Sequence, residues 1–430
     1  MKKYAVAGKP ILHSKSPDIF NRLFAMHDLD AHYVKFTAKE IDGIAKMAKL
    51  FDVNGLNITA PFKEKLSEYV QVSDAAVDAT GACNTVLFEE KIQAFNFDCD
   101  GVLLSILEVM PDVKDKKALV IGAGGAAKAA AFALKNANAD VSIINRTFAN
   151  TIDLARMFDA TSVKISEINE DFLSDFSIVV NTLEYPYQLF EPSLLKKCVL
   201  LDANYKNSIF STIVEANQVQ LIGGKRWLMN HAVKSFKCFT GLDVSVSEME
   251  AVFEQQKAVL PHCICLSGMP GVGKSALGKE LAEKLQYHFL DVDALIEDKT
   301  KMTISEIFDT KGEPFFRKIE KEIIQESILK KNIVLSLGGG AVATDDVYRL
   351  IKENVLVITL VCEMETLIKR TSADHRPLLK NKDVNSILNE LFENRKNRYF
   401  QSSDLIFFYQ DITVEEASDL LVEDIRKSYF

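Results

Sequence analysis

Gly268-Met-Pro-Gly-Val-Gly-Lys-Ser275 is the stretch of sequence that decides the fold of the second half of the chain. It is a complete G-x-x-x-x-G-K-[ST] loop, whose glycines let consecutive backbone N–H groups point at phosphate oxygens. The short apolar run Cys263-Ile-Cys-Leu266 before it is typical of a buried strand. Leu277, Leu281 and Leu285 after it recur at helical spacing. A nucleotide-binding α/β domain is therefore predicted to begin just before this loop. Because the loop comes so late in the chain, we expect a complete folded unit to precede it.

Each part of the loop has a predicted role. The lysine can reach the β- and γ-phosphates of a nucleotide, and the serine hydroxyl can hold Mg²⁺. A full match between a strand and a helix is seldom purely structural. The predicted nucleotide contacts are Gly268, Gly271, Val272, Gly273, Lys274, Ser275 and Ala276.

Composition bounds the class of protein. The chain has 430 residues, 48% of them hydrophobic, which is enough for two or three domains with full cores. Its net charge of -9 argues against a general nucleic-acid binder. Seven cysteines, none at metal-ligand spacing, suggest reduced thiols. We expect no signal peptide, and no apolar run approaches the ~18 residues of a membrane span. We expect a soluble, cytoplasmic protein that acts on small-molecule substrates and has no nucleic-acid or membrane partners. The sequence leaves its oligomeric state open.

A second glycine turn lies earlier in the chain. The apolar run Ala118-Leu-Val-Ile121 is followed by Gly122-Ala-Gly-Gly-Ala-Ala127 and an alanine-rich helix, which is the G-x-G-x-x-[G/A] dinucleotide fingerprint. The next predicted strand ends at Asn145-Arg-Thr147. An acid there would bind the ribose of NAD, whereas arginine suits the 2′-phosphate of NADP. The predicted contacts are Gly122, Ala123, Gly124, Gly125, Ala126, Asn145, Arg146 and Thr147.

Residues 4–255 resemble shikimate dehydrogenase in four motifs that occur in the family order. These are Gly8-Lys-Pro-Ile-Leu-His-Ser-Lys-Ser-Pro17, Asn57-Ile-Thr-Ala-Pro-Phe-Lys63, Gly81-Ala-Cys-Asn-Thr85 and Asp98-Cys-Asp-Gly101. The resemblance implies that Lys63 and Asp100 are catalytic. It implies that Ser14, Ser16, Thr59, Asn84, Tyr205 and His231 bind the substrate.

The chemistry of that pair makes independent sense. Reduction of a ketone by a nicotinamide needs a proton donor at the carbonyl oxygen, and a lysine beside an aspartate can hold and deliver the proton. The chain departs from the family pattern at His231, where a glutamine is usual, at Asn150, and at Asn181-Thr-Leu-Glu184. A histidine can still bind a substrate hydroxyl, but its protonation would make that contact depend on pH.

From about residue 262 the chain resembles shikimate kinase, a P-loop kinase with a mobile lid. The motifs are Phe289-Leu-Asp-Val-Asp293, Phe315-Phe-Arg-Lys-Ile-Glu320, Gly338-Gly-Gly340 and Arg395-Lys-Asn-Arg-Tyr399. The resemblance implies that Lys274, Asp293 and Arg376 are catalytic and that Ser275 and Asp291 hold Mg²⁺. It implies that Arg317, Gly338, Gly339, Gly340 and Arg395 bind the substrate and that Arg370 contacts the nucleotide.

The sequence therefore predicts an α/β protein made of two fused enzymes. An N-terminal α/β substrate domain (1–100 and 225–257) and a Rossmann-like NADP domain (101–224) precede a P-loop kinase domain with a parallel sheet and a lid (262–430). The expected reactions are NADPH-dependent reduction of 3-dehydroshikimate to shikimate and ATP-dependent phosphorylation of shikimate to shikimate 3-phosphate. The expected cofactors are NADP(H), ATP and Mg²⁺.

Two alternatives remain open. The N-terminal part could be a binding or regulatory module that has lost catalysis, since several of its family positions are altered. It could also be an NAD-dependent dehydrogenase of quinate, although Arg146 and the lack of a nearby acid weigh against this.

Overall fold

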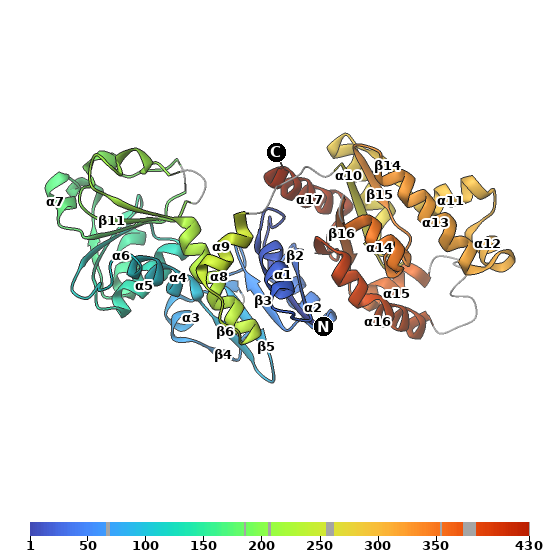
Figure 1. Cartoon of the computed structure of the whole chain (residues 1–430), viewed down its shortest axis with the longest axis horizontal. Coiled ribbons are helices and arrows are strands. Elements are labelled where there is room, and N and C mark those ends of the chain that lie inside the picture. Colours follow the sequence, from blue (N-terminus) through green and yellow to red (C-terminus); the bar gives the residue numbers. More distant parts are fainter. Residues whose placement is uncertain are drawn as a thin grey trace. The chain divides into compact units, whose positions relative to one another are not determined.

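The computed structural model describes residues 1–65, 69–184, 186–204, 208–254, 262–352, 355–372 and 384–429. It forms two compact units, which we call the first unit (Met1–Phe62 and Gln255–Phe430) and the second unit (Lys63–Glu254) (Figure 1). Both are α/β, as the sequence predicts. Two predicted site residues, Tyr205 and Arg376, lie outside the described residues.

A parallel sheet forms the centre of the first unit. Its strands are β1 (Lys2–Ala7), β2 (Ala31–Ala38), β3 (Gly55–Ile58), β13 (Cys263–Gly268), β14 (His288–Asp291), β15 (Ile333–Ser336), β16 (Leu356–Val361) and β17 (Leu405–Phe408). They follow one another in the order β14-β15-β13-β16-β17-β2-β1-β3. Every residue of β13 and β16 is buried, as expected for strands covered on both faces.

Helices surround this sheet (Figure 1). The N-terminal part contributes α1 (Ser16–Met26) and α2 (Ile41–Leu50). The C-terminal part contributes α10 (Lys274–Leu285), α11 (Val292–Thr300), α12 (Ile304–Thr310), α13 (Gly312–Ile328), α14 (Asp345–Lys352), α15 (Met364–Ser372), α16 (Val384–Ser402) and α17 (Val414–Tyr429), with the 3₁₀ turn η5 (Ala341–Ala343).

The pairing of β2 with β17 joins the two ends of the chain. Its register runs from Leu405 opposite Lys35 to Phe408 opposite Ala38. Without this pairing, β2 and β17 would each be an edge strand with unpaired N–H and C=O groups. This pairing explains why residues 1–62 form one compact unit with the C-terminal part. The domain boundaries predicted from the sequence stay a prediction.

A six-stranded parallel sheet organises most of the second unit. Its strands are β7 (Lys117–Ile121), β8 (Asp140–Ile144), β9 (Thr161–Val163), β10 (Ile178–Asn181), β11 (Val199–Asp202) and β12 (Gln220–Gly223), in the order β12-β11-β10-β7-β8-β9. The smaller strands β4 (Val72–Ser73), β5 (Thr85–Phe88) and β6 (Ile92–Phe95) also belong to this unit, and β6 pairs with both others.

The helices of the second unit cover both faces of the larger sheet. They are α3 (Ala75–Thr80), α4 (Phe97–Leu107), α5 (Gly125–Asn136), α6 (Phe148–Met157), α7 (Glu170–Ser174), α8 (Gly224–Thr240) and α9 (Val246–Glu254), with the 3₁₀ turns η2 (Ile165–Glu167), η3 (Pro192–Leu194) and η4 (Ser211–Ile213).

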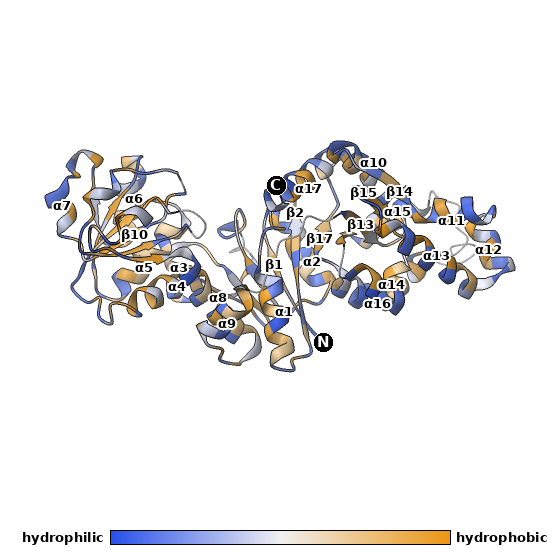
Figure 2. Cartoon of the chain, turned by 45° about the horizontal axis from the view of Figure 1, so that its top comes forward, coloured by the Kyte–Doolittle hydropathy of each residue, from blue (hydrophilic) through white to orange (hydrophobic). Residues whose placement is uncertain are grey.

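Strand alternation divides the core of this unit in two. Ala118 and Val120 of β7 pack in one buried cluster with residues of α4 and α5, whereas Leu119 and Ile121 pack in another on the opposite face. Figure 2 shows hydrophobic residues gathered on the strands and hydrophilic residues on outer surfaces such as that of α7. In the described part of the chain, no helix is long and apolar enough to cross a membrane.

Candidate active sites

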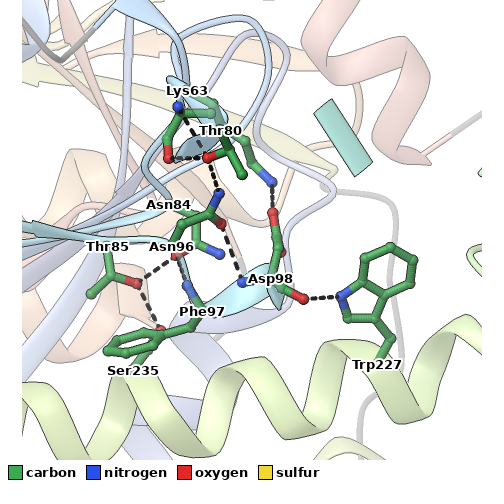
Figure 3. A network of polar contacts seen from close by, with 10 residues as sticks. Lys63, Thr80, Asn84, Thr85, Asn96, Phe97, Asp98, Trp227 and Ser235 are labelled. Atoms are coloured by element: carbon green, nitrogen blue, oxygen red, sulfur yellow. Dashed lines mark hydrogen bonds and ion pairs between the residues drawn. The ribbon is translucent and has the colours of Figure 1, made fainter. Parts of the chain in front are cut away.

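The predicted catalytic lysine lies in the second unit beside a carboxylate (Figure 3). Lys63 Nζ donates to Oδ2 of Asp98, in the first turn of α4, at 2.5 Å. The two side chains are 33% and 16% exposed. A charge-assisted hydrogen bond that is partly shielded from water is among the stronger polar contacts in proteins. The pair therefore has the composition needed to hold a proton and release it.

Asp100 is not the partner of Lys63, which corrects the pairing predicted from the sequence. Its carboxylate lies 3.3 Å from Lys234 Nζ. Residues two apart on a helix point about 200° apart, because a turn has ~3.6 residues, so only one of the two acids can face the lysine. Asn96 caps α4 and accepts from the backbone N–H of Asp98 at 3.3 Å. The sequence carried a signal for this, because Asn96-Phe-Asp98 has the N-x-D spacing of the family's N-T-D-G motif.

Asn84 anchors the acid from the other side. It is 1% exposed. Its Oδ1 accepts from the backbone N–H of Phe97 and from the Thr85 hydroxyl, both at 3.0 Å. Its side chain also hydrogen-bonds to the Asp98 carboxylate. The indole N–H of Trp227 donates to the Asp98 carbonyl oxygen at 3.0 Å (Figure 3). Backbone and side-chain contacts thus hold the acid in one orientation.

His231, on α8, completes the electrostatic environment of the pair. Burial acts to raise the pKa of Asp98, but the charges of Lys63 and His231 and the hydrogen bonds from Lys63 and Asn84 outweigh it. The pKa therefore lies below its ordinary 3.8. Burial lowers the pKa of His231 below 6.5, and Lys63 acts in the same direction, while Asp98 and Asp100 oppose the shift. At neutral pH the carboxylate is ionised and the imidazole is neutral.

The hydroxyl residues predicted to bind substrate lie in the first unit, in loops that follow β1 and β3. These strands are parallel neighbours, so both loops leave the same edge of the sheet. Ser14 Oγ donates to Ser16 Oγ at 3.4 Å. A Cβ added to Gly8 would lie 2.5 Å from Cγ2 of Thr59, so the two loops can approach this closely only with glycine at residue 8. Ser14, Ser16 and Thr59 are only partly buried, so their hydroxyls can bind a small polar acid.

The predicted dinucleotide turn lies between β7 and α5. Gly122 has a φ of 117°, and a Cβ there would lie 2.2 Å from Oγ1 of Thr182, so only glycine fits. Gly124 caps α5 without a side chain, and a Cβ on Gly124 or Gly125 would meet open space. Ala123 and Ala126 are partly buried beside them. The open N-terminus of α5 leaves backbone N–H groups for a phosphate.

Asn145, Arg146 and Thr147 follow β8, the neighbour of β7 in the sheet. Arg146 is exposed, and Thr147 is the residue at which α6 is capped. Asn145 Nδ2 donates to the Thr147 carbonyl oxygen at 3.4 Å, so this hydrogen bond lies within the turn. An exposed guanidinium at this edge of the sheet can bind a 2′-phosphate bidentately.

The phosphate loop connects β13 to α10 in the first unit. Gly268, Gly271 and Gly273 have φ values of 133°, 82° and 107°, which favour glycine. Lys274 Nζ donates to the carbonyl oxygens of Gly268 and Met269, at 3.0 and 3.1 Å. The ammonium group of Lys274 thus lies against the loop, where the phosphates of a nucleotide would also bind. Val272 is buried under the loop, and Ala276 is exposed in the first turn of α10.

Ser275 and Asp291 come together at the mouth of this loop. The serine hydroxyl donates to Oδ2 of Asp291 at 2.6 Å, while Oδ1 caps α11 by accepting from the N–H groups of Asp293 and Ala294. Hydroxyl and carboxylate oxygens are the ligands that Mg²⁺ prefers, and it usually takes only one or two from the protein when it binds with a nucleotide. Across the described ranges, no cluster of three or more His, Cys, Asp or Glu could hold a metal ion by itself.

The predicted substrate residues of the second site gather around a glycine run after β15. A Cβ on Gly338 would lie 3.3 Å from Oδ1 of Asp293, and one on Gly340 would lie 2.6 Å from Nη2 of Arg317. Arg395 donates to the Gly339 carbonyl oxygen at 3.1 Å. Acidic side chains and two arginines therefore surround a stretch of bare backbone, as binding of an anionic, hydroxylated molecule requires.

Glu320 also belongs to this site, although the sequence alone predicts no role for it. Its side chain is 1% exposed, and Oε2 accepts from Arg317 Nη1 at 2.7 Å. Burial raises the pKa of Glu320 above its ordinary 4.5, although Arg317 opposes the shift. Glu313 accepts from Nε and Nη2 of the same guanidinium. The signal was the spacing of three in Phe-Arg-Lys-Ile-Glu, which puts acid and arginine on one helix face.

Arg370 lies where it could cover a nucleotide. Its Nη1 donates to the Val272 carbonyl oxygen at 3.0 Å, and its guanidinium carbon lies 5.5 Å from the Tyr409 ring centroid. Both contacts hold it against the phosphate loop. The predicted lid arginine, Arg376, is outside the described residues, as is Tyr205.

Three family models match the chain. That of the shikimate dehydrogenase substrate binding domain matches residues 6–86, and that of shikimate / quinate 5-dehydrogenase matches residues 104–210. That of shikimate kinase matches residues 270–426. Shikimate dehydrogenase (NADP+) of Aquifex aeolicus strain VF5 is 32% identical over 256 residues, which cover 57% of this chain and 94% of the relative. Shikimate kinase of Persephonella marina is 44% identical over 140 residues, which cover 32% of this chain and 84% of the relative.

The chain belongs to both the shikimate dehydrogenase and the shikimate kinase families. The resemblance inferred from the motifs is thereby confirmed. We call residues 1–254 the dehydrogenase part and residues 262–430 the kinase part.

Solved structures agree for the dehydrogenase part. The crystal structure of shikimate dehydrogenase from Aquifex aeolicus is 31% identical with a TM-score of 0.56, covering 59% of this chain and 98% of that one. That of shikimate 5-dehydrogenase from Thermus thermophilus, solved with NADP(H) and shikimate, is 26% identical with a TM-score of 0.53, covering 59% and 99%. The chain thus matches nearly the whole length of these dehydrogenases, with a kinase attached.

Proposed function

We propose that this chain reduces 3-dehydroshikimate to shikimate with NADPH and then phosphorylates shikimate with ATP. The observation that carries the proposal is that one chain holds two separate catalytic sets. The Lys63–Asp98 pair suits proton transfer to a carbonyl. The phosphate loop, with the contact between Ser275 and Asp291, suits phosphoryl transfer. The product of the first reaction is the substrate of the second.

In the reductase, Lys63 would donate its proton to the carbonyl oxygen of the substrate. NADPH, when bound, supplies the hydride that reaches the carbonyl carbon. Asp98 holds the ammonium group in place and stabilises its charge before transfer, because its lowered pKa keeps it ionised. Asp98 thus takes the role that the sequence assigned to Asp100. Ser14, Ser16 and Thr59 would bind the substrate carboxylate and hydroxyls, with Asn84 and His231 binding further hydroxyls.

The dinucleotide would lie on the second glycine turn. Gly122, Gly124 and Gly125 leave room for a pyrophosphate at the N-terminus of α5. Arg146 would bind the 2′-phosphate and favour NADPH over NADH. The same residue weighs against an NAD-dependent quinate dehydrogenase. Parallel assays with quinate and NAD⁺ would detect such an activity.

In the kinase, the first task is to neutralise the charge of the phosphates. Lys274 would reach the β- and γ-phosphates, and Ser275 and Asp291 would hold Mg²⁺, which supplies further positive charge when bound. Arg370 would cover the nucleotide, and Arg376 would close over the transferring group. The proposed contacts of Arg376 rest on its sequence motif alone.

The acceptor hydroxyl would be placed by Asp293. This carboxylate lies close to Gly338, so a hydroxyl bound there can give up its proton to it. Arg317 and Arg395 would hold the substrate carboxylate through bidentate contacts. Glu320 and Glu313 fix the Arg317 guanidinium before substrate arrives, which lowers the entropy lost on binding.

The setting we propose is cytoplasmic. All seven cysteines are free thiols, and none bridges to another. Burial raises the pKa of several of them, for example that of Cys198 to about 11, so these thiols are protonated and unreactive at neutral pH. Free, buried thiols are typical of proteins in reducing compartments.

The test uses single-site variants of the full chain. Lys63→Ala should abolish NADPH oxidation with 3-dehydroshikimate and leave phosphorylation of added shikimate intact. Lys274→Ala should do the reverse. The exposed Lys116→Ala and Lys330→Ala serve as matched controls that keep both activities. Wild-type protein that forms ADP from shikimate yet never oxidises NADPH would mean that the dehydrogenase part is a binding module instead.

A further inference from the structure

The loop between β1 and α1 carries Ser14 and Ser16 and runs through a buried region of the first unit. Ile11 and Leu12 are 0% and 4% exposed, and their backbone N–H groups point away from water. Buried N–H groups need acceptors, because an unpaired one costs free energy comparable to a lost hydrogen bond. The acceptor that they find fixes the path of the loop towards the two serines.

That acceptor is Asp424, a residue of the kinase part. Its Oδ1 accepts from the N–H of Ile11 at 2.8 Å and from that of Leu12 at 2.6 Å, and its Oδ2 lies 3.0 Å from the N–H of Ile11. Asp424 is 2% exposed and lies on α17, the last helix of the chain. A carboxylate that accepts two backbone N–H groups acts as a rigid clamp.

Lys35 holds the same loop from the dehydrogenase part. Its Nζ donates to the Leu12 carbonyl oxygen at 2.9 Å. Lys35 lies on β2, directly opposite Leu405 of β17 in the joined sheet. Both polar groups of the Leu12 backbone are therefore bonded to charged side chains. Burial lowers the pKa of Lys35, and Asp424 is among the carboxylates that oppose the shift.

Further contacts join the N-terminal part to the C-terminal elements near this loop. Phe36 and Phe51 from the N-terminal part pack against Phe400 of α16, with ring centroids 6.2 and 5.7 Å apart. Thr37 donates to the Gly8 carbonyl oxygen at 3.0 Å and ties the start of the loop to β2. With the β2–β17 pairing, these contacts hold the N-terminal strands and the C-terminal elements together in the first unit.

We propose that Asp424 is a positioning residue of the dehydrogenase reaction, supplied by the kinase part. It holds the loop after β1 so that Ser14 and Ser16 present their hydroxyls to the substrate carboxylate. The inference rests on the proposed function, since it takes these serines as substrate ligands. It implies that the kinase part supplies a residue that the dehydrogenase reaction needs, so the fusion does more than place two enzymes on one chain.

The test is Asp424→Asn in the full chain. The amide keeps the shape of the carboxylate but loses its charge and offers one acceptor oxygen in place of two. The KM for 3-dehydroshikimate should rise roughly tenfold, as expected when charge-assisted contacts are lost, with kcat unchanged. The KM for NADPH and both kinase KM values should stay within about twofold. Asp419→Asn is the matched control, because Asp419 is an exposed aspartate of the same helix that pairs with Lys284.

Four further results decide the matter. Asp424→Glu should restore part of the lost affinity, whereas Asp424→Ala should not. A normal KM in Asp424→Asn, while Ser14→Ala raises KM, would overturn the positioning role alone. If Ser14→Ala and Ser16→Ala both leave KM unchanged, the proposed ligands of the substrate are wrong instead. A parallel loss of both activities and of the melting temperature would show a merely structural role and would also overturn the proposal.

One measurement needs no variant. Hydrogen exchange of the unmodified protein should show slow exchange at the amides of Ile11 and Leu12, because both are buried and bonded to a carboxylate. Rapid exchange at both amides, beside slow exchange in β1, would mean that α17 does not hold the loop, and would overturn the proposal even if Asp424 variants fail to fold.

Discussion

The ammonium group of Lys63 lies 2.5 Å from the carboxylate of Asp98, whereas Asp100, two residues later on the same helix, faces Lys234. The rotation of α4 about its own axis determines which of the two acids faces Lys63. Asn96 caps the helix, and Trp227 bonds the Asp98 carbonyl oxygen, so the helix cannot rotate to exchange them. The proton donation that we propose therefore depends on a helix cap as much as on the two charged groups.

Replacing each acid by its amide should separate their roles. We expect Asp98→Asn to lower the kcat of the reductase by about 10²-fold or more, because the lysine loses the group that holds its charge. Asp100→Asn, a matched change on the same helix, should keep kcat within about twofold. Steady-state rates of NADPH oxidation at saturating substrate measure both. A large loss in Asp100→Asn with a normal Asp98→Asn would reverse the assignment.

The cofactor preference should follow Arg146. Arg146→Ala removes the guanidinium that we propose binds the 2′-phosphate, so the KM for NADPH should rise roughly tenfold or more while that for NADH stays unchanged. Arg156→Ala, which changes an exposed arginine of α6, is the control. Equal KM values for NADPH in the wild type and in Arg146→Ala would show that the phosphate is bound elsewhere.

Removal of divalent metal should separate the two activities. Treatment with EDTA should abolish phosphorylation of shikimate and leave NADPH oxidation intact, because only the kinase set contains proposed Mg²⁺ ligands. Ser275→Ala should raise the Mg²⁺ concentration that gives the half-maximal rate, whereas Ser305→Ala on α12 should not. Kinase activity that persists in EDTA would contradict the proposed metal site.

The reductase should lose substrate affinity in acid through His231. The pKa of this histidine is lowered by burial, so the imidazole is neutral at neutral pH and gains a proton only in acid. Protonation places a second cation beside Lys63 and removes an acceptor for a substrate hydroxyl. Asp98 cannot cause this change, because its pKa lies below 3.8.

We therefore expect the KM for 3-dehydroshikimate to be flat around neutral pH and to rise in acid, below about pH 6.5. His231→Gln should give a KM that varies little with pH across the acid range. Because the folded pKa is below the unfolded value, acid also disfavours folding here, so melting temperatures should be measured at each pH. An identical acid rise in His231→Gln would rule the histidine out as its cause.

The phosphate loop and the dinucleotide turn could be predicted from sequence because their chemistry is local. The φ values of Gly268 and Gly122 follow from the turns that they make, and the neighbouring strands and helices have clear periodicity. The grouping of Asp293, Arg317 and Arg395 around Gly338–Gly340 needed the family motifs, because those residues come from different elements.

The partner of Lys63 and the role of Asp424 could not be read in the same way. Two acids stand within Asp98-Cys-Asp-Gly101. The N-x-D spacing of Asn96 and Asp98 favours the first acid and the Asp-Gly pair favours the second, and the cap of α4 shows which one faces inward. The contact between Asp424 and Ile11 spans 413 positions and depends on the pairing of two edge strands. No local pattern specifies such a pairing, because an edge strand has the same hydrophobic pattern whether it meets water or another strand.

The central claim is that one chain makes shikimate and then phosphorylates it. The most direct measurement supplies the purified protein with 3-dehydroshikimate, NADPH, ATP and Mg²⁺, and follows NADPH by absorbance and the products by mass spectrometry. We predict one NADPH oxidised and one ADP formed for each shikimate 3-phosphate. Formation of shikimate 3-phosphate only when shikimate itself is added, with no oxidation of NADPH, would contradict the account.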